Sequence, residues 1–250
     1  MIEIENVAKS YGSQIALAAT TLAFKPTATT VLIGPSGCGK STLLRIIVGL
    51  VRTDSGRVIL EQQELTPANQ NPLRHRIGYV IQDGGLFPHL NAEQNVTLLA
   101  HFLKRSDAEI EHRLSHLADL VQLPRASLSR YPVNLSGGQR QRVGLMRALM
   151  LDPPILLLDE PLGALDPITR NELQTQLKHI FSELKKTVVL VTHDMGEAAY
   201  FGDEIVLMRD GAIVQRGPLA DLITQPATGY VTDFIRAQRS PLSALLDPAR

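Results

Sequence analysis

A glycine-rich stretch with a lysine and two hydroxyl side chains occupies positions 34–42. In order, its residues are Gly34, Pro35, Ser36, Gly37, Cys38, Gly39, Lys40, Ser41 and Thr42. They fit the pattern G-x-x-x-x-G-K-[ST], in which glycines let backbone N–H groups turn inward around phosphate oxygens. Lys40 adds a positive charge for the β- and γ-phosphates, and the Ser41 hydroxyl can ligate Mg²⁺. The stretch predicts a loop that binds the phosphates of a nucleotide.

A predicted strand and a predicted helix flank this loop. Residues 28–33 are apolar and β-branched, as in a buried strand, and residues 41–50 are mostly Leu, Ile and Val, as in a helix that packs on a sheet. The helix adds the partial positive charge of its N-terminus. A glycine-rich turn that contains Lys-Ser by chance is the alternative, and the two flanking elements argue against it.

Two carboxylates follow the most apolar strand of the chain. Residues 155–158 are aliphatic, and Asp159 and Glu160 come directly after them. Ligand sites of parallel sheets lie at the carboxyl ends of the strands, so we expect both acids at the edge that carries the glycine-rich loop. Asp159 suits a Mg²⁺ shell, and Glu160 can polarise a water for attack on the terminal phosphorus. The alternative is a pair of exposed acids with no such role.

Two other predicted strands also end in polar side chains. Gln82 follows the strand 77–81, and its amide is within reach of a metal or a water if it faces the loop. His193 follows the strand 187–192, and its imidazole can donate a hydrogen bond to a phosphate oxygen. Ordinary loop structure is the alternative for Gln82, and a bond to a backbone carbonyl is the alternative for His193.

The N-terminal region contains an aromatic residue upstream of the loop. Residues 2–7 and 21–25 read as strands on either side of the turn-rich segment 9–12, which contains Tyr11. A ring in such a loop can stack on a base, and an ordinary exposed tyrosine is the alternative.

Residues 86–152 have a helical pattern with polar helix starts. Asn91 with Gln94, and Ser106 with Glu109, resemble capping boxes. Phe87 and Pro88, at the start of this region, read either as a contact for a partner or as a buried hinge.

Two further predicted helix starts have polar residues at their first positions. Leu135, Ser136, Gly137, Gly138 and Gln139 precede a helix, which is a second anion-binding geometry or a plain N-cap. Asp166 before Pro167 is a typical N-cap followed by proline at the first helical position.

Composition restricts the class of protein. Lysine and arginine total 25, as do aspartate and glutamate, so no net charge attracts the chain to nucleic acid or anionic lipid. The single cysteine excludes an internal disulfide, and residues 1–5 lack the basic start of a signal peptide. No apolar run approaches the roughly 20 residues that cross a bilayer. We expect a soluble protein, or one that a partner attaches to a membrane.

In combination, these segments resemble the nucleotide-binding subunits of ABC transporters over residues 1–235. The segments similar to the family's motifs are Tyr11 (A-loop), Gly34–Thr42 (Walker A), Gln82 (Q-loop), Leu135–Gln139 (signature), Ile155–Asp159 (Walker B), Glu160 (catalytic carboxylate), Ala164–Asp166 (D-loop) and His193 (switch histidine). The resemblance implies an α/β fold: a P-loop NTPase (RecA-like) core with an N-terminal antiparallel β region and an inserted α-helical subdomain. It places the core at 1–85 and 154–235, the helical subdomain at 86–153, and a short tail at 236–250.

The resemblance also implies the chemistry and the partners. ATP and Mg²⁺ are the expected ligands, with Lys40, Gln82, Glu160 and His193 as catalytic residues and Ser41, Gln82 and Asp159 around the metal. Ser136, Gly137, Gly138, Gln139 and Asp166 would act in trans, across a homodimer or a pair with a similar ATPase subunit. Integral-membrane permease subunits, and through them a substrate-binding protein, would hold the chain at the cytoplasmic face of the membrane, without nucleic acid.

Three segments favour the branch that imports osmoprotectants such as glycine betaine, choline, carnitine or proline. They are 77–82, 85–89 and 164–170. Import of an amino acid or another small solute is the main alternative. A soluble ABC-type ATPase that works on DNA or ribosomes, and a nucleotide-dependent regulatory module with negligible turnover, are the others.

Overall fold

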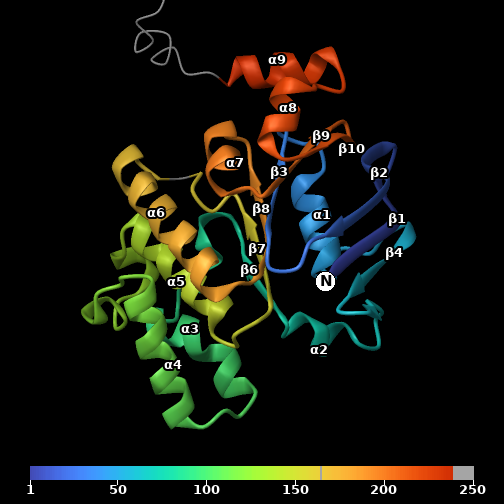
Figure 1. Cartoon of the computed structure of the whole chain (residues 1–250). Coiled ribbons are helices and arrows are strands. Elements are labelled where there is room, and N and C mark those ends of the chain that lie inside the picture. The colour runs from blue at the N-terminus through green and yellow to red at the C-terminus, as the bar shows by residue number, and fades with distance from the viewer. Residues whose placement is uncertain (164, 239–250) are drawn as a thin grey trace, which may run out of the picture.

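Two β-sheets and the helices packed on them make up the fold (Figure 1). The computed structural model describes residues 1–163 and 165–238, without the side chain of Asp83. Ala164 of the predicted D-loop and most of the predicted tail therefore lie outside the described residues.

The larger sheet places the predicted site residues that follow its parallel strands at one edge. Its strand order is β10-β9-β3-β8-β7-β6, and all neighbouring pairs are parallel except β9 with β10. The strands are β3 (Thr29–Ile33), β6 (Ile77–Val80), β7 (Ile155–Asp159), β8 (Thr187–Thr192), β9 (Glu204–Arg209) and β10 (Ala212–Gly217). Because the parallel strands run in one direction, the residues that follow β3, β6, β7 and β8 meet at the same edge.

Both faces of the parallel strands of this sheet are buried, which explains why these strands are apolar without alternation. Side chains of adjacent strand residues point to opposite faces. Val31 and Ile33 belong to the core on the face covered by α3 (Ala92–Phe102), α4 (Asp107–Leu120), α5 (Gly137–Leu149) and α6 (Pro167–Leu184). Leu32 belongs to the core on the other face, which is shared with α1 (Lys40–Ile47) and the smaller sheet.

The smaller sheet is antiparallel and corrects one prediction. Its order is β2-β1-β4-β5, with β1 at Ile2–Tyr11, β2 at Gln14–Phe24, β4 at Ser55–Leu60 and β5 at Gln63–Glu64. Residues 9–11, predicted as turn, belong to β1, and Tyr11 pairs with Gln14 at the end of the hairpin. Register shifts along β1 let the hairpin continue through polar residues at an exposed end, so Tyr11 ends a strand and does not lie in a loop.

Short and long helices connect the strands. They are α2 (Gln70–Arg74), α3 (Ala92–Phe102), α4 (Asp107–Leu120), α5 (Gly137–Leu149), α6 (Pro167–Leu184), α7 (Met195–Phe201), α8 (Leu219–Thr224), α9 (Gly229–Ala237) and the 3-10 turns η1 (Gln82–Gly85), η2 (Arg125–Ser127) and η3 (Pro132–Asn134). The predicted capping boxes of α3 and α4 are confirmed. The predicted helix over 41–50 ends earlier, because Gly49 adopts a left-handed conformation. In the described part of the chain, no helix combines the length and apolarity needed to span a membrane.

Asn95 joins η1 to α3 through a fully buried side chain. Its Oδ1 accepts from the N–H of Phe87 at 2.7 Å. Its Nδ2 donates to the carbonyls of Phe87, Leu90 and Asn91 at 2.9–3.1 Å. One amide therefore satisfies four backbone groups of the segment between the two elements.

We expect Asn95→Ala to lower the free energy of unfolding by about 2–4 kcal/mol, because it leaves buried backbone groups without partners. Urea denaturation followed by circular dichroism measures the change. Asn171→Ala, at an exposed position of α6, is the matched control and should stay within about 0.5 kcal/mol. Equal stabilities of Asn95→Ala and the native protein would contradict this role.

Candidate functional site

The glycine-rich loop between β3 and α1 surrounds the ammonium group of Lys40. The side chain is buried, and its Nζ donates to the carbonyls of Gly34 at 2.8 Å and Pro35 at 3.0 Å. Residues 35–37 are exposed, so the rim of the loop faces solvent while the cation lies beneath it. The loop therefore presents a fixed positive charge and backbone N–H groups to an anion.

Two glycines of this loop are required by close backbone approaches. A Cβ on Gly39 would collide with the carbonyl oxygen of Ala16 in β2, and one on Gly34 would collide with that of Met208 in β9. Both also have positive φ angles, of 103° and 153°. The smaller sheet and β9 thus press directly on the loop, a contact that the sequence pattern does not show.

The turn between β9 and β10 adds a hydrogen-bonded support. The N–H of Gly211 donates to the carbonyl of Cys38 at 3.2 Å, and the carbonyl of Gly211 accepts from Ala18 of β2 at 2.8 Å. Arg209, in the same hairpin, lies 4.3 Å from the ring centroid of Tyr230 in α9. The C-terminal helix is therefore attached to the hairpin that supports the loop.

Ser41 and Asp159 meet as predicted. The Ser41 Oγ donates to Asp159 Oδ1 at 2.8 Å, although the two residues are 118 positions apart in the chain. The hydroxyl of Tyr79 lies 3.4 Å from the other carboxylate oxygen, and burial followed by the charge of Asp159 raises the pKa of Tyr79 to about 12. Tyr79 thus remains a neutral phenol beside the carboxylate, and no functional role was predicted for it.

Glu160 and His193 also lie side by side. The His193 Nδ1 is 3.5 Å from Glu160 Oε2, with the glutamate side chain 24% exposed and the imidazole 62% exposed. Glu160 has a left-handed backbone with φ of 47°, and its N–H donates to the carbonyl of Val191 at 3.0 Å. Non-glycine residues in this conformation are uncommon and gather at functional sites. The change in backbone direction separates the Glu160 side chain from that of Asp159.

Gln82 and Tyr11 lie at the margins of this arrangement. Gln82 is exposed at the start of η1, beside the strand that ends at Asp159, and its side chain has no hydrogen bond to another described residue. Tyr11 is half exposed, with the Lys9 ammonium 5.5 Å from its ring centroid. It lies near the loop because its pairing partner, Gln14, precedes Ala16 in β2, whose carbonyl lies against Gly39.

The second predicted anion-binding terminus is a capping box. Ser136 caps α5: its Oγ accepts from the N–H of Gln139 at 3.2 Å, and the Gln139 Oε1 accepts from the N–H of Ser136 at 3.0 Å. The remaining N–H groups at this end, including those of Gly137 and Gly138, have the orientation that binds anions at helix N-termini. The structure therefore confirms the N-cap, and anion binding at this terminus stays a prediction.

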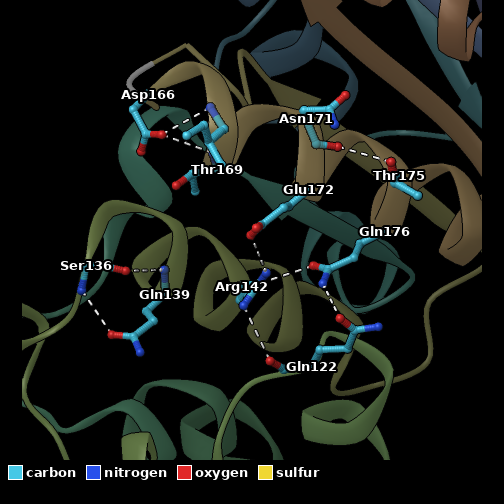
Figure 2. Close-up of polar contacts among 11 residues, drawn as sticks. Gln122, Ser136, Gln139, Arg142, Asp166, Thr169, Asn171, Glu172, Thr175 and Gln176 are labelled. Carbon is cyan, nitrogen blue, oxygen red and sulfur yellow. Dashed lines mark hydrogen bonds and ion pairs between the residues drawn. The ribbon is translucent and has the colours of Figure 1, made fainter.

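The starts of α5 and α6 lie against each other (Figure 2). A Cβ on Gly138 would lie 2.6 Å from the methyl group of Thr169, so a larger residue would require Thr169 to shift. Asp166 caps α6 as predicted, with Oδ1 accepting from the N–H groups of Ile168 at 3.1 Å and Thr169 at 3.0 Å. A hydrogen bond from the Thr169 side chain, followed by the backbone bonds, holds the pKa of the Asp166 carboxyl below its usual range.

Arg142 joins the same two helices further along (Figure 2). Its Nε donates to Gln176 of α6 at 3.1 Å, and Glu172 lies 3.9 Å from its Nη2. Gln176 in turn donates to Gln122 Oε1, after α4, at 2.7 Å. The termini that carry Ser136 and Asp166 are therefore held at one relative position.

The predicted residues form two separate groups within one chain. Lys40, Ser41, Asp159, Glu160 and His193 gather at the edge of the larger sheet. Ser136–Gln139 lie instead at the start of α5, which packs with α3, α4 and α6 on one face of the larger sheet. The helix α1, which follows the glycine-rich loop, lies on the opposite face (Figure 1). One copy therefore brings the glycine-rich loop, a hydroxyl–carboxylate pair and a glutamate–histidine pair together, and leaves the capped N-terminus of α5 apart.

Comparison with known proteins identifies the family. The family model described as "ABC transporter" matches residues 17–163. The choline transport ATP-binding protein OpuBA of Bacillus subtilis is 41% identical over 100% of this chain and 66% of its own length. The glycine betaine uptake system ATP-binding protein YehX of Escherichia coli is 44% identical over 94% of this chain and 76% of its own length. The chain spans 60% of the length of the carnitine transport ATP-binding protein OpuCA of Listeria monocytogenes.

Solved structures agree with this assignment. The ATP-binding cassette MJ0796, solved as a dimer in a post-hydrolysis state bound to ADP and Pi, superposes with a TM-score of 0.80 at 36% identity, over 88% of this chain and 99% of that one. The predicted α/β fold, with an antiparallel β region and helices beside a mainly parallel sheet, is confirmed. This chain belongs to the ABC transporter family.

Proposed function

We propose that this chain is the ATP-hydrolysing subunit of an ABC importer, and that ATP closes a dimer of it and hydrolysis reopens the dimer. The observation that carries the proposal is the meeting of the Lys40 loop, the Ser41–Asp159 pair and the Glu160–His193 pair at one sheet edge. Phosphate binding, metal binding and water activation act on the same triphosphate, so these three groups must lie close enough to contact it together.

ATP is the substrate, and the loop is suited to its β- and γ-phosphates. Lys40 supplies the full charge, and the glycines remove the side chains that would block backbone N–H groups. The Ser41 hydroxyl and the Asp159 carboxylate are oxygen donors of the kind that Mg²⁺ prefers, and Gln82 stands beside them at the same edge. When bound, Mg²⁺ neutralises phosphate charge.

Glu160 and His193 divide the remaining tasks. Glu160 is only partly exposed and is free of the Ser41 contact, so it can accept a proton from the attacking water. The imidazole of His193 projects from the end of β8 and can donate to the γ-phosphate. Their proximity supports one reaction centre in which the acid and the imidazole act on the same phosphorus.

A second copy completes the site. Ser136–Gln139 form an anion-binding terminus that is separate from the loop of the same chain, so we assign it, together with Asp166, to the γ-phosphate side of a partner. A two-fold dimer then holds two ATP molecules, each between a loop and a signature helix. Shifting such a dimer from mostly open to mostly closed takes about 5.5 kcal/mol, which several charge-assisted hydrogen bonds can supply.

A groove beside Gln82 is the proposed contact with membrane-embedded permease subunits. It has a volume of about 480 Å³ and is lined in part by Phe87, Leu98 and Leu99, which are exposed apolar side chains. Arg147 of α5 lies under it and donates to the carbonyls of residues 84 and 85 in η1 at 2.8–2.9 Å. A movement of α5 would therefore reach the groove directly, which favours residues 86–153 as a subdomain that couples the two sites.

For the cargo, we propose an osmoprotectant or quaternary amine such as glycine betaine, choline or carnitine, delivered by a substrate-binding protein. Relatives named for these solutes share 41–44% identity with the chain. Relatives named for sulfate import share 43–44%, so another small solute is the alternative. Attachment to permease subunits would place the chain at the cytoplasmic face of the membrane.

We expect Glu160→Gln to bind ATP and to lower kcat by about 10²- to 10⁴-fold, because the amide cannot accept a proton. The variant should then accumulate as a dimer with Mg-ATP in size-exclusion chromatography. Lys40→Ala should instead weaken ATP binding by about 10- to 100-fold in calorimetry, because it removes a charge-assisted bond. Glu183→Gln, on the exposed side of α6, is the control. Glu160→Gln monomers with unchanged turnover would exclude this role.

We also expect Leu98→Glu to abolish co-purification of permease subunits while the isolated subunit keeps its ATPase activity, because a buried charge would disrupt an apolar contact. Ile223→Glu, at an equally exposed apolar position of α8, should leave the complex intact.

In vesicles containing the complete native complex and its binding protein, quaternary amines should stimulate ATP hydrolysis more than amino acids do. Stimulation by an amino acid alone would overturn the proposed cargo.

A further inference from the structure

Glu197, in the first turn of α7, is a buried carboxyl that the reaction described above does not use. Only 5% of the residue is exposed. The Thr192 Oγ1 donates to Glu197 Oε2 at 2.6 Å, and this is a buried bond between the end of β8 and α7. Burial raises the pKa of the Glu197 carboxyl.

The Thr192 hydroxyl links this carboxyl to the backbone that carries His193. While donating to Glu197, it accepts from the N–H of Asp194 at 3.0 Å. Asp194 then caps α7, with Oδ1 accepting from Gly196 at 2.6 Å and from Glu197 at 3.2 Å. The residues before and after His193 are therefore both fixed through Thr192.

The imidazole itself has little else to hold it. Its side chain is 62% exposed, and its one ion-pair partner among the described residues is Glu160. A side chain with so few contacts takes its position mainly from its backbone. The backbone bonds made through Thr192 thus decide where the imidazole can reach.

The charges that face Glu197 come from the same region. His193 and Arg170 favour its ionised form, and Asp194 opposes it. These groups and Glu160 line one small cavity of about 20 Å³. Arg170 donates to the carbonyl of Leu165, next to Asp166, at 3.2 Å. Glu197 therefore lies directly behind the reaction centre.

We propose that Glu197 is a positioning residue for ATP hydrolysis, which acts through the Thr192 hydroxyl to hold the His193 backbone and so keeps the imidazole beside Glu160. The inference rests on the proposed function, because it assigns a role within that reaction. A role confined to the stability of α7 is the competing interpretation, and the two differ in their dependence on His193.

The test removes the Thr192 hydroxyl while keeping the size and branching of the side chain. We expect Thr192→Val to lower kcat on the order of 10- to 100-fold with a smaller change in KM for ATP, because displacement of a reacting group reduces turnover more than binding. Thr192→Ser, which keeps the hydroxyl, should restore most of the turnover. Thr97→Val removes an equally buried hydroxyl from α3 and is the matched control. Glu197→Met removes the acceptor in place of the donor and must reproduce the pattern.

A double-mutant cycle with His193→Ala separates positioning from stability. If Glu197 acts through the imidazole, Thr192→Val should add little further loss of kcat once His193 is absent. Fully additive losses, or a Thr192→Val enzyme with native kcat and a native unfolding temperature, would overturn the inference while leaving the ATPase proposal intact. A native protein without turnover would instead refute the proposed function, and the inference with it.

Discussion

The Ser41 hydroxyl and the Asp159 carboxylate lie 2.8 Å apart because β3 and β7 run parallel with β8 between them. This contact joins the loop that carries Lys40 to the strand that carries the acids. Triphosphate charge is too dense to be held by one group, so lysine, backbone N–H groups and oxygen ligands must converge. A parallel sheet achieves this convergence because residues distant in sequence leave its strands at one edge.

The same physics underlies the proposed division of work between two copies. One helix N-terminus follows the glycine-rich loop, and the other, at Ser136, is held on the helical side by Arg142 and by the contact of Gly138 with Thr169. Because α5 also supports η1 and the groove through Arg147, any displacement of the Ser136 terminus is transmitted to the proposed permease contact. This arrangement gives the helical region a reason to be a separate, movable part of the proposed machine.

Sequence patterns were sufficient to predict site residues that directly follow a recognisable strand or belong to a recognisable loop. Lys40, Asp159 and His193 each follow an apolar strand or belong to a glycine-rich loop, so their positions could be predicted. Tyr11 was wrongly placed in a loop, because register shifts within a hairpin have no composition of their own. Tyr79 was missed because its contact depends on which strand neighbours β7. Glu197 follows Asp194 with capping-box spacing, yet it accepts from Thr192, a choice that only the packing of α7 determines.

The central claim is that each ATP lies between the loop of one copy and the signature helix of the other, and mixing two inactive variants tests it most directly. Lys40→Ala disables the loop, and Gly138→Asp disables the signature terminus. In an equimolar mixture, a heterodimer retains one site built from the intact Lys40 of one copy and the intact Ser136–Gly138 of its partner. The account predicts ATPase activity above the sum of the two variants assayed alone. Activity equal to that sum, with heterodimers present, would contradict it.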